Sequence, residues 1–179
     1  MRGSKVVTVI LFGMYVLIVS QCRKNNAEPE LPPETTNGAG TFGCKVIARN
    51  FVPKSGNGQP GLYVKYSRTG VGLNESWNLV ITAVNYGSKH TELVQIGTDS
   101  LLLETGKKYI FDKKSGFPFI VYAFDLKPFP YKPEKSGELY ITKHDKDARI
   151  LSGRFWFNIY SLADSSIVRV TEGRFDVRY

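Results

Sequence analysis

Short segments in which apolar and polar residues alternate, divided by Gly and Pro, constrain the fold of this chain most strongly. In one such segment, Leu62, Val64 and Tyr66 fall on the same face. Tyr63 and Lys65, which lie between them, fall on the other face. A period of two residues is that of a β-strand, and no stretch shows a convincing helical spacing of i, i+3 and i+4. The pattern predicts an all-β fold with a single antiparallel β-sandwich domain; a lipocalin-like β-barrel is the alternative architecture.

The alternation also indicates where the strands lie and what joins them. Arg49 and Asn50 are expected to form a tight hairpin turn between the first two strands. Residues 117–126 are apolar on both faces and are predicted to form a central strand, whereas residues 127–133 contain three prolines and are not. Strands are predicted at residues 42–48, 51–53, 62–67, 77–86, 93–96, 107–111, 117–126, 138–143, 149–161 and 167–179.

The last predicted strand changes its apolar face part-way along. Val168 and Val170 occupy even positions, but the later apolar residues occupy odd ones. We therefore expect a β-bulge or tight turn at Glu172-Gly173, and a similar role for Gly153 in the preceding strand. Beyond the bulge, a row of alternating charges is predicted to face solvent: Arg174, Asp176 and Arg178.

The first 21 residues have the pattern of an export signal. Arg2 and Lys5 precede an apolar run, residues 6–19, that is shorter than the roughly 20 residues of a membrane-spanning helix. The sequence Val19-Ser20-Gln21-Cys22 resembles the lipobox of bacterial lipoproteins, with Gln21 in place of the usual Gly, Ala or Ser. The resemblance implies cleavage before Cys22 and attachment of acyl chains such as palmitate to Cys22. The alternative is an ordinary signal peptide that leaves Cys22 as a thiol.

The chain has two cysteines, Cys22 and Cys44. If Cys22 carries lipid, then Cys44 is single and is expected to be a small buried apolar residue. In an exported chain without lipid, a Cys22–Cys44 disulfide is the competing prediction. Residues 22–40, which follow the export signal, are rich in Pro, Asn, Glu and Gly and are predicted to form a flexible tether. The folded domain is predicted at residues 41–179.

The net charge of +8 raises the question of an anionic partner. The basic residues are spread along the chain and form no dense cluster of the kind found in nucleic-acid arms. We therefore expect no nucleic-acid partner.

Three segments resemble a family of small bacterial lipoproteins whose function is not established. They are Leu31-Pro-Pro-Glu-Thr-Thr-Asn-Gly-Ala-Gly-Thr-Phe-Gly-Cys44, Ser152-Gly-Arg-Phe-Trp-Phe157 and Glu172-Gly-Arg-Phe-Asp-Val-Arg-Tyr179. The resemblance covers nearly all of the chain after Cys22. It implies an all-β envelope protein and carries over no catalytic residues.

Catalytic and metal-binding patterns are weak. Neither His90 nor His144 accompanies a nucleophile motif, and the cluster His144-Asp145-Lys146-Asp147 is better explained as a turn than as a set of metal ligands. A glycosidase would need two facing carboxylates; the candidate pairs are Asp99 with Glu104 and Asp125 with Glu138. We predict no cofactor, no metal site and no catalytic residue.

Aromatic residues are the better binding candidates. Trp77 and Trp156 lie in predicted strands, so core packing is the favoured interpretation for both. Phe129 and Tyr131 lie in a proline-rich loop and are expected to be exposed. A concave patch that exposes Trp156 or Tyr131 would favour a glycan, and a flat apolar patch would favour a protein partner.

The expected protein is a lipid-anchored module of the outer membrane, facing the periplasm or the cell surface. Its predicted role is non-catalytic binding or an accessory function, with the membrane as a partner through the lipid. A structural envelope protein that contacts other membrane components is the alternative, and a carboxylate-based hydrolase ranks last.

Overall fold

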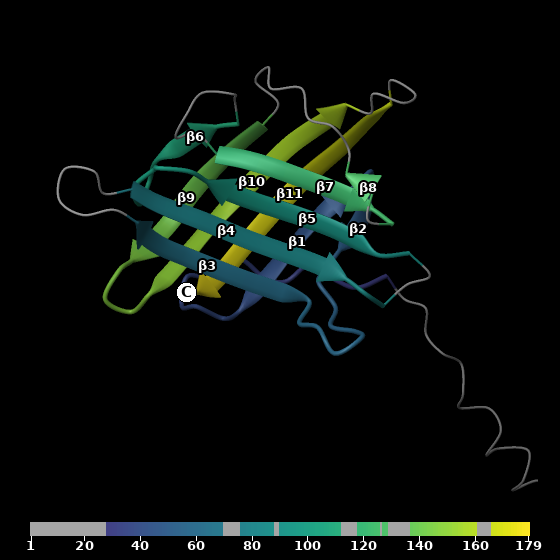
Figure 1. Ribbon diagram of the computed structural model, residues 1–179, viewed down its shortest axis with the longest axis horizontal. Helices are drawn as coiled ribbons and strands as arrows, with labels where there is room; N and C mark the ends of the chain where they lie inside the picture. The colour runs from purple at the N-terminus through teal and green to yellow at the C-terminus, as the bar shows by residue number, and fades with distance from the viewer. Residues whose placement is uncertain are drawn as a thin grey trace, which may run out of the picture.

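Two antiparallel sheets pack face to face, and their strands cross at a steep angle (Figure 1). This computed structural model describes residues 28–69, 76–87, 90–111, 118–125, 127–128, 137–160 and 166–179. Those residues contain no helix, and hence none long and apolar enough to cross a membrane. The predicted all-β sandwich is confirmed, and the two sheets do not close into a lipocalin-like barrel.

Most strands in each sheet pair with a strand that directly precedes or follows them in the sequence, and the pairing is antiparallel. The six-stranded sheet has the order β2 (Arg49–Phe51), β1 (Thr41–Val46), β11 (Ile167–Arg178), β10 (Ile150–Tyr160), β9 (Gly137–Asp145) and β6 (Lys108–Ile110). The five-stranded sheet has the order β3 (Leu62–Thr69), β4 (Ser76–Asn85), β5 (Glu92–Thr98), β7 (Pro118–Phe124) and β8 (Lys127–Pro128).

The core lies between the two sheets and follows the predicted alternation. The inward residues of β4 and β10 are fully buried, because each faces the opposite sheet, while their neighbours in the sequence face outward. Cys44 lies in this core as a free thiol with an exposed fraction of 0%. Its other fully buried residues include Leu79, Ile81, Val94, Ile96, Leu151, Phe157 and Ile159.

The bulge predicted at Glu172-Gly173 is confirmed. Phe155 and Phe157 of β10 pair with Gly173 and Val170 of β11, so β11 contains one extra residue there. Glu172 adopts a φ of 52°, in the left-handed region that favours glycine, and it faces solvent. The bulge returns Val170 and Gly173 to the same side of the sheet.

The prediction for Gly153 is wrong in its placement. β10 pairs with β11 residue for residue from Ile150 to Phe155, and the extra residue lies in the neighbouring strand β9, between Ile141 and Lys143. A Cβ on Gly153 would lie 2.6 Å from the carbonyl oxygen of Tyr140. Gly153 therefore permits close packing of the strands and does not itself bulge.

Two further expectations about the strands are corrected. The tight turn between β1 and β2 is formed by Ile47 and Ala48, with φ values of 47° and 67°, and Arg49 begins the next strand. β7 lies next to the edge of its sheet, because among the described residues only the two-residue strand β8 lies beyond it. Lys127 and Pro128 occupy that edge, where a residue without an N–H is tolerated.

Residues 28–40, which we call the strap, do not extend away from the domain as a tether would. They lie along the outer face of the six-stranded sheet, where a Cβ on Gly43 would meet Pro32 at 2.5 Å. At the other end of the strap, the backbone amides of Gly38 and Ala39 donate hydrogen bonds of 2.8 and 3.1 Å to Asp176. The absence of a side chain at Gly43 allows this close approach.

Asp176 was expected to face solvent with Arg174 and Arg178, and this expectation is wrong. Its exposed fraction is 1%, and its carboxylate also accepts hydrogen bonds from Thr35 at 2.6 Å and from Ser152 at 2.7 Å. Burial alone would raise the pKa of Asp176, but these hydrogen bonds together lower it to about 2. The buried carboxylate stays charged and fastens the strap to β10 and β11.

Candidate functional site

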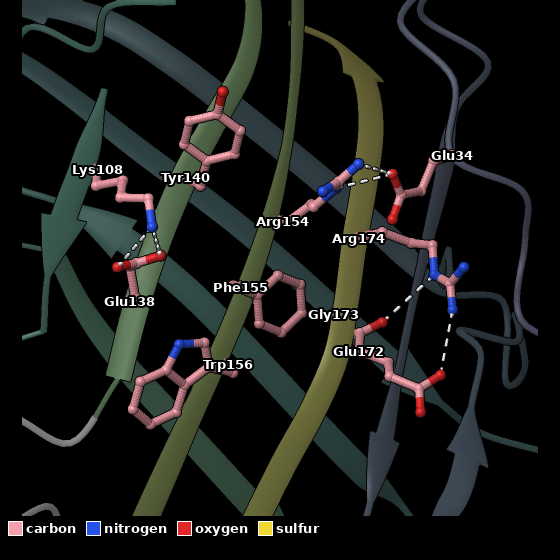
Figure 2. Close-up of a pocket in the computed structure, with 10 residues that line it drawn as sticks. All are labelled: Glu34, Lys108, Glu138, Tyr140, Arg154, Phe155, Trp156, Glu172, Gly173 and Arg174. Atoms are coloured by element: carbon pink, nitrogen blue, oxygen red, sulfur yellow. Dashed lines mark hydrogen bonds and ion pairs between the residues drawn. The ribbon is translucent and has the colours of Figure 1, made fainter. Parts of the chain in front are cut away.

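A hollow of about 480 Å³ lies on the outer face of the six-stranded sheet, beside the strap (Figure 2). Its wall combines charged and aromatic side chains from the strap and from strands β6, β9, β10 and β11. We call it the charged hollow. It is lined by Glu34, Lys108, Glu138, Tyr140, Arg154, Phe155, Trp156, Glu172, Gly173 and Arg174.

Strand register brings most of these side chains together. Tyr140 of β9 pairs with Lys108 of β6 on one side and with Arg154 of β10 on the other, and Arg154 pairs in turn with Arg174 of β11. Residues that pair directly in an antiparallel sheet project from the same face, so one row of side chains crosses four strands. A second row contains Trp156, which pairs with Glu138.

The bulge in β11 shapes one side of the hollow. It turns Glu172 toward solvent and leaves Gly173 buried beside Phe155. A Cβ on Gly173 would lie 2.5 Å from the Phe155 ring. The lack of a side chain at Gly173 therefore lets the ring pack directly against the backbone of β11. The base of the hollow is thus backbone and a buried aromatic ring.

The carboxylate of Glu34 connects the strap to the hollow. One of its oxygens, Oε2, lies 2.5 Å from Nη2 and 2.8 Å from Nε of Arg154. Figure 2 shows both interactions at the edge of the hollow where the strap passes. Both side chains are exposed, so the pair contributes little to stability but holds the guanidinium in one orientation.

The other two carboxylates of the hollow also have cationic partners. Lys108 lies 3.2 Å from Glu138, and Arg174 lies 3.7 Å from Glu172. Positive and negative groups therefore alternate around the rim. Such a rim offers many hydrogen-bond donors and acceptors without a strong net field.

Trp156 supplies the largest exposed apolar surface in the hollow, with an exposed fraction of 44%. The core packing that was favoured for it from the sequence is wrong, because Trp156 faces outward between the buried Phe155 and Phe157. Tyr140 is half-buried, and the ammonium of Lys108 lies 6.0 Å from its ring centroid. Two aromatic residues thus stand among charged groups.

Comparison with protein-family models, curated proteins and solved structures gave no match.

Trp77, the other tryptophan, does not line the charged hollow. Trp77 is partly buried and stacks on Tyr66, with ring centroids 5.1 Å apart, as expected for packing against the core. Phe129 and Tyr131 lie outside the described residues, as does Cys22, the predicted lipid attachment site.

The candidate carboxylate pairs are not brought together in the hollow. Glu138 lines it, but Asp125 follows β7 in the other sheet and contacts His90, with 2.7 Å between Oδ2 and Nδ1. Asp99 accepts a hydrogen bond from Ser100, and neither Asp99 nor Glu104 lines the hollow.

His144 is held by neighbouring groups. Its Nδ1 lies 2.9 Å from the carbonyl oxygen of Leu103 and therefore carries a proton, since a carbonyl only accepts. Its Nε2 lies 3.0 Å from the hydroxyl of Tyr179. Within the described part of the chain, no three His, Cys, Asp or Glu side chains are grouped closely enough to hold a metal ion.

Trp156 and Glu138 were candidates from the sequence, whereas Glu34, Tyr140 and Arg154 were not. Trp156 could have been placed from the alternation, because Arg154 and Asn158 on its own face are polar while Phe155 and Phe157 are apolar. Tyr140 shares a face with Glu138 by the same rule. No comparable signal exists for Glu34, whose position depends on the path of the strap.

Proposed function

We propose that this chain is a lipid-anchored envelope protein that binds a glycan, without catalysis, in the charged hollow. The observation that carries the proposal is the exposed indole of Trp156 among paired charged side chains in a concave site. A concave patch that exposes Trp156 is expected of a glycan-binding site, whereas a protein-binding site is expected to be flat and apolar. The structural envelope protein is the second candidate.

A sugar ring fits the chemistry of this site. The C–H face of a pyranose is apolar and can stack on the Trp156 indole, whose buried area contributes to binding. The ring hydroxyls both donate and accept hydrogen bonds, so they match the guanidinium of Arg154 and the carboxylate of Glu138. These groups are oriented in advance by strand register and ion pairs, which lowers the entropy lost on binding.

The arrangement of carboxylates favours binding over hydrolysis. Glu34, Glu138 and Glu172 each lie beside a different cation. A carboxylate-based hydrolase needs one acid that remains protonated and a second that attacks or activates water. Each of these carboxylates is instead engaged in its own ion pair, an arrangement that orients hydrogen-bond acceptors for a bound ring.

Envelope attachment rests on the first 22 residues. The basic start, the apolar run and the lipobox-like Val19-Ser20-Gln21-Cys22 support export and acylation at Cys22. Two or more acyl chains would anchor the chain stably in the outer membrane. Intact-mass analysis of membrane-extracted protein tests this: a chain that begins at residue 22 with added acyl mass supports the anchor, and a Cys22–Cys44 disulfide contradicts it.

The glycan proposal is tested with residues 22–179 carrying Cys22→Ser on an array of bacterial envelope polysaccharides. We expect binding to at least one glycan, and a loss of tenfold or more in affinity for Trp156→Ala. Tyr63→Ala is the matched control, because Tyr63 is an exposed aromatic residue on the five-stranded sheet. Glycan binding that is equal in all three proteins contradicts the proposed site, and absence of binding favours the structural candidate.

A further inference from the structure

The turn between β1 and β2 places an isoleucine where the backbone disfavours it. Ile47 has a φ of 47° and Ala48 a φ of 67°, the two positive values of a type I′ turn. Such turns are dominated by Asn and Gly, and a β-branched residue in the left-handed region is strained. The side chain of Ile47 is also 60% exposed, so it gains little from packing. Neither local geometry nor burial explains this residue.

Other exposed apolar and basic side chains surround Ile47. Ile47 and Ile167 line one hollow of about 430 Å³, together with Lys45, Arg169 and Glu172. The ammonium of Lys45 lies 2.6 Å from a carboxylate oxygen of Glu172, so Arg169 is the basic residue of this lining for which no ion pair is seen in the part of the chain that the structure describes. Tyr160 pairs with Ile167 across β10 and β11 and is also exposed. We call this group the hairpin patch: Lys45, Ile47, Ala48, Tyr160, Ile167 and Arg169. Two isoleucines, a tyrosine and an arginine are residue types that enter the interface of a bilayer with anionic lipids.

The first described residues of the chain, Glu28 and Pro29, lie beside the hairpin that carries the patch. Asn50, which follows the turn, donates its backbone amide to the carboxylate of Glu28 and its side-chain amide to the carbonyl oxygen of Pro29 at 3.0 Å. Cys22 lies six residues before Glu28. An extended chain spans at most about 3.6 Å per residue, so acyl chains on Cys22 would lie within about 22 Å of Glu28.

We propose that the hairpin patch is a membrane-contact site that inserts Ile47 into the surface of a phospholipid bilayer. The inference that this side of the molecule faces the membrane depends on the proposed lipid anchor at Cys22. The contact between the hairpin patch and the bilayer does not itself need acylation. Ile47 and Ile167 enter below the headgroups, while Arg169 meets the lipid phosphates. Contact at this patch fixes the orientation of the domain and of the charged hollow relative to the membrane.

The test uses residues 22–179 with Cys22→Ser, so that no acyl chain contributes to binding. Every contact described above lies within residues 28–179, which this chain retains. Its partition onto vesicles of phosphatidylethanolamine and phosphatidylglycerol is measured by co-sedimentation, together with its melting temperature. Ile47→Gly removes the apolar side chain and relieves the backbone, whereas Tyr63→Ala removes an exposed aromatic residue on the other sheet.

We expect Ile47→Gly to weaken partition about tenfold, as the loss of one buried isoleucine implies, with an unchanged or raised melting temperature. Tyr63→Ala should bind vesicles like the parent. Equal partition of the parent and Ile47→Gly, or no partition of the parent, overturns the inference. A dimer in sedimentation experiments that Ile47→Gly dissociates overturns it as well, because the occupant is then a second copy. No acyl chain is present in any of these proteins. A negative result here therefore does not bear on the lipid anchor, which the intact-mass analysis tests independently.

Discussion

Thr35 donates a hydrogen bond of 2.6 Å to Asp176, and this contact joins two residues that are 141 positions apart in the chain. It fixes the strap to β11, the last strand in the chain. The adjacent residue, Glu34, reaches Arg154 and forms one wall of the charged hollow. A buried carboxylate that lines no part of the hollow thus determines where one of its walls lies.

Replacement of Asp176 by Asn is expected to release the strap. The amide keeps the size of the side chain, but its nitrogen replaces one carboxylate oxygen and cannot accept a hydrogen bond. Either the bonds from Thr35 and Ala39 to Oδ2 or those from Gly38 and Ser152 to Oδ1 are therefore lost. We expect a loss of about 2 kcal/mol in the free energy of unfolding, since hydrogen bonds to a buried charge are the strong ones. Urea unfolding measures it, with the exposed turn residue Asp147→Asn as control. A loss below about 0.5 kcal/mol, the usual size for surface changes, contradicts the role of Asp176.

Acid should destabilise the domain through the same carboxylate. The pKa of Asp176 is about 2 in the folded chain, below the ordinary value of 3.8. Its contribution is therefore fully present above about pH 4 and is lost as the pH falls toward 2. Melting temperatures between pH 5 and 2 should fall less steeply for Asp176→Asn than for the parent. Parallel curves for the two proteins would show that Asp176 does not control this step.

The sequence predicted the sandwich and the bulge at Glu172 because both follow from the period of two in side-chain direction. The same rule applied to β10 would have exposed Trp156, but strand membership alone was taken to favour the core. The burial of Asp176 could not be read from its alternating neighbours Arg174 and Arg178. Its partners lie in the strap, and hydrogen bonds between distant polar segments leave no periodic signal in either segment.

Cys44 should be unreactive while the domain is folded. Burial, followed by the charge of nearby Glu92, raises the pKa of its thiol well above the ordinary range. We expect alkylation by iodoacetamide at pH 8 to proceed at the rate at which the domain opens, and to accelerate with urea as unfolding does. The matched reference is Lys146→Cys in the exposed turn after β9, which should react at once. Rapid alkylation of Cys44 in the absence of urea would contradict its place in the core.

Arg154 is expected to matter for binding more than for folding. Arg154→Gln removes the ion pair with Glu34, but both side chains are exposed, so the melting temperature should change little. Affinity for the glycan found on the array should fall about fivefold or more, because charge-assisted hydrogen bonds to the sugar are lost. Lys65→Gln, on the exposed face of β3, is the control for the change in net charge. Similar losses of affinity in both variants would indicate nonspecific electrostatic attraction.

The most direct test of glycan binding in the charged hollow uses the two tryptophans of the chain. Each gives one indole N–H resonance in a nitrogen–proton NMR spectrum, and Trp156→Phe and Trp77→Phe assign them. Titration with an envelope polysaccharide fragment selected on the array should shift the resonance of Trp156 progressively. The resonance of Trp77, which stacks on Tyr66 beside the core, should stay in place. A titration that leaves Trp156 unshifted while binding is measured by calorimetry would contradict the account.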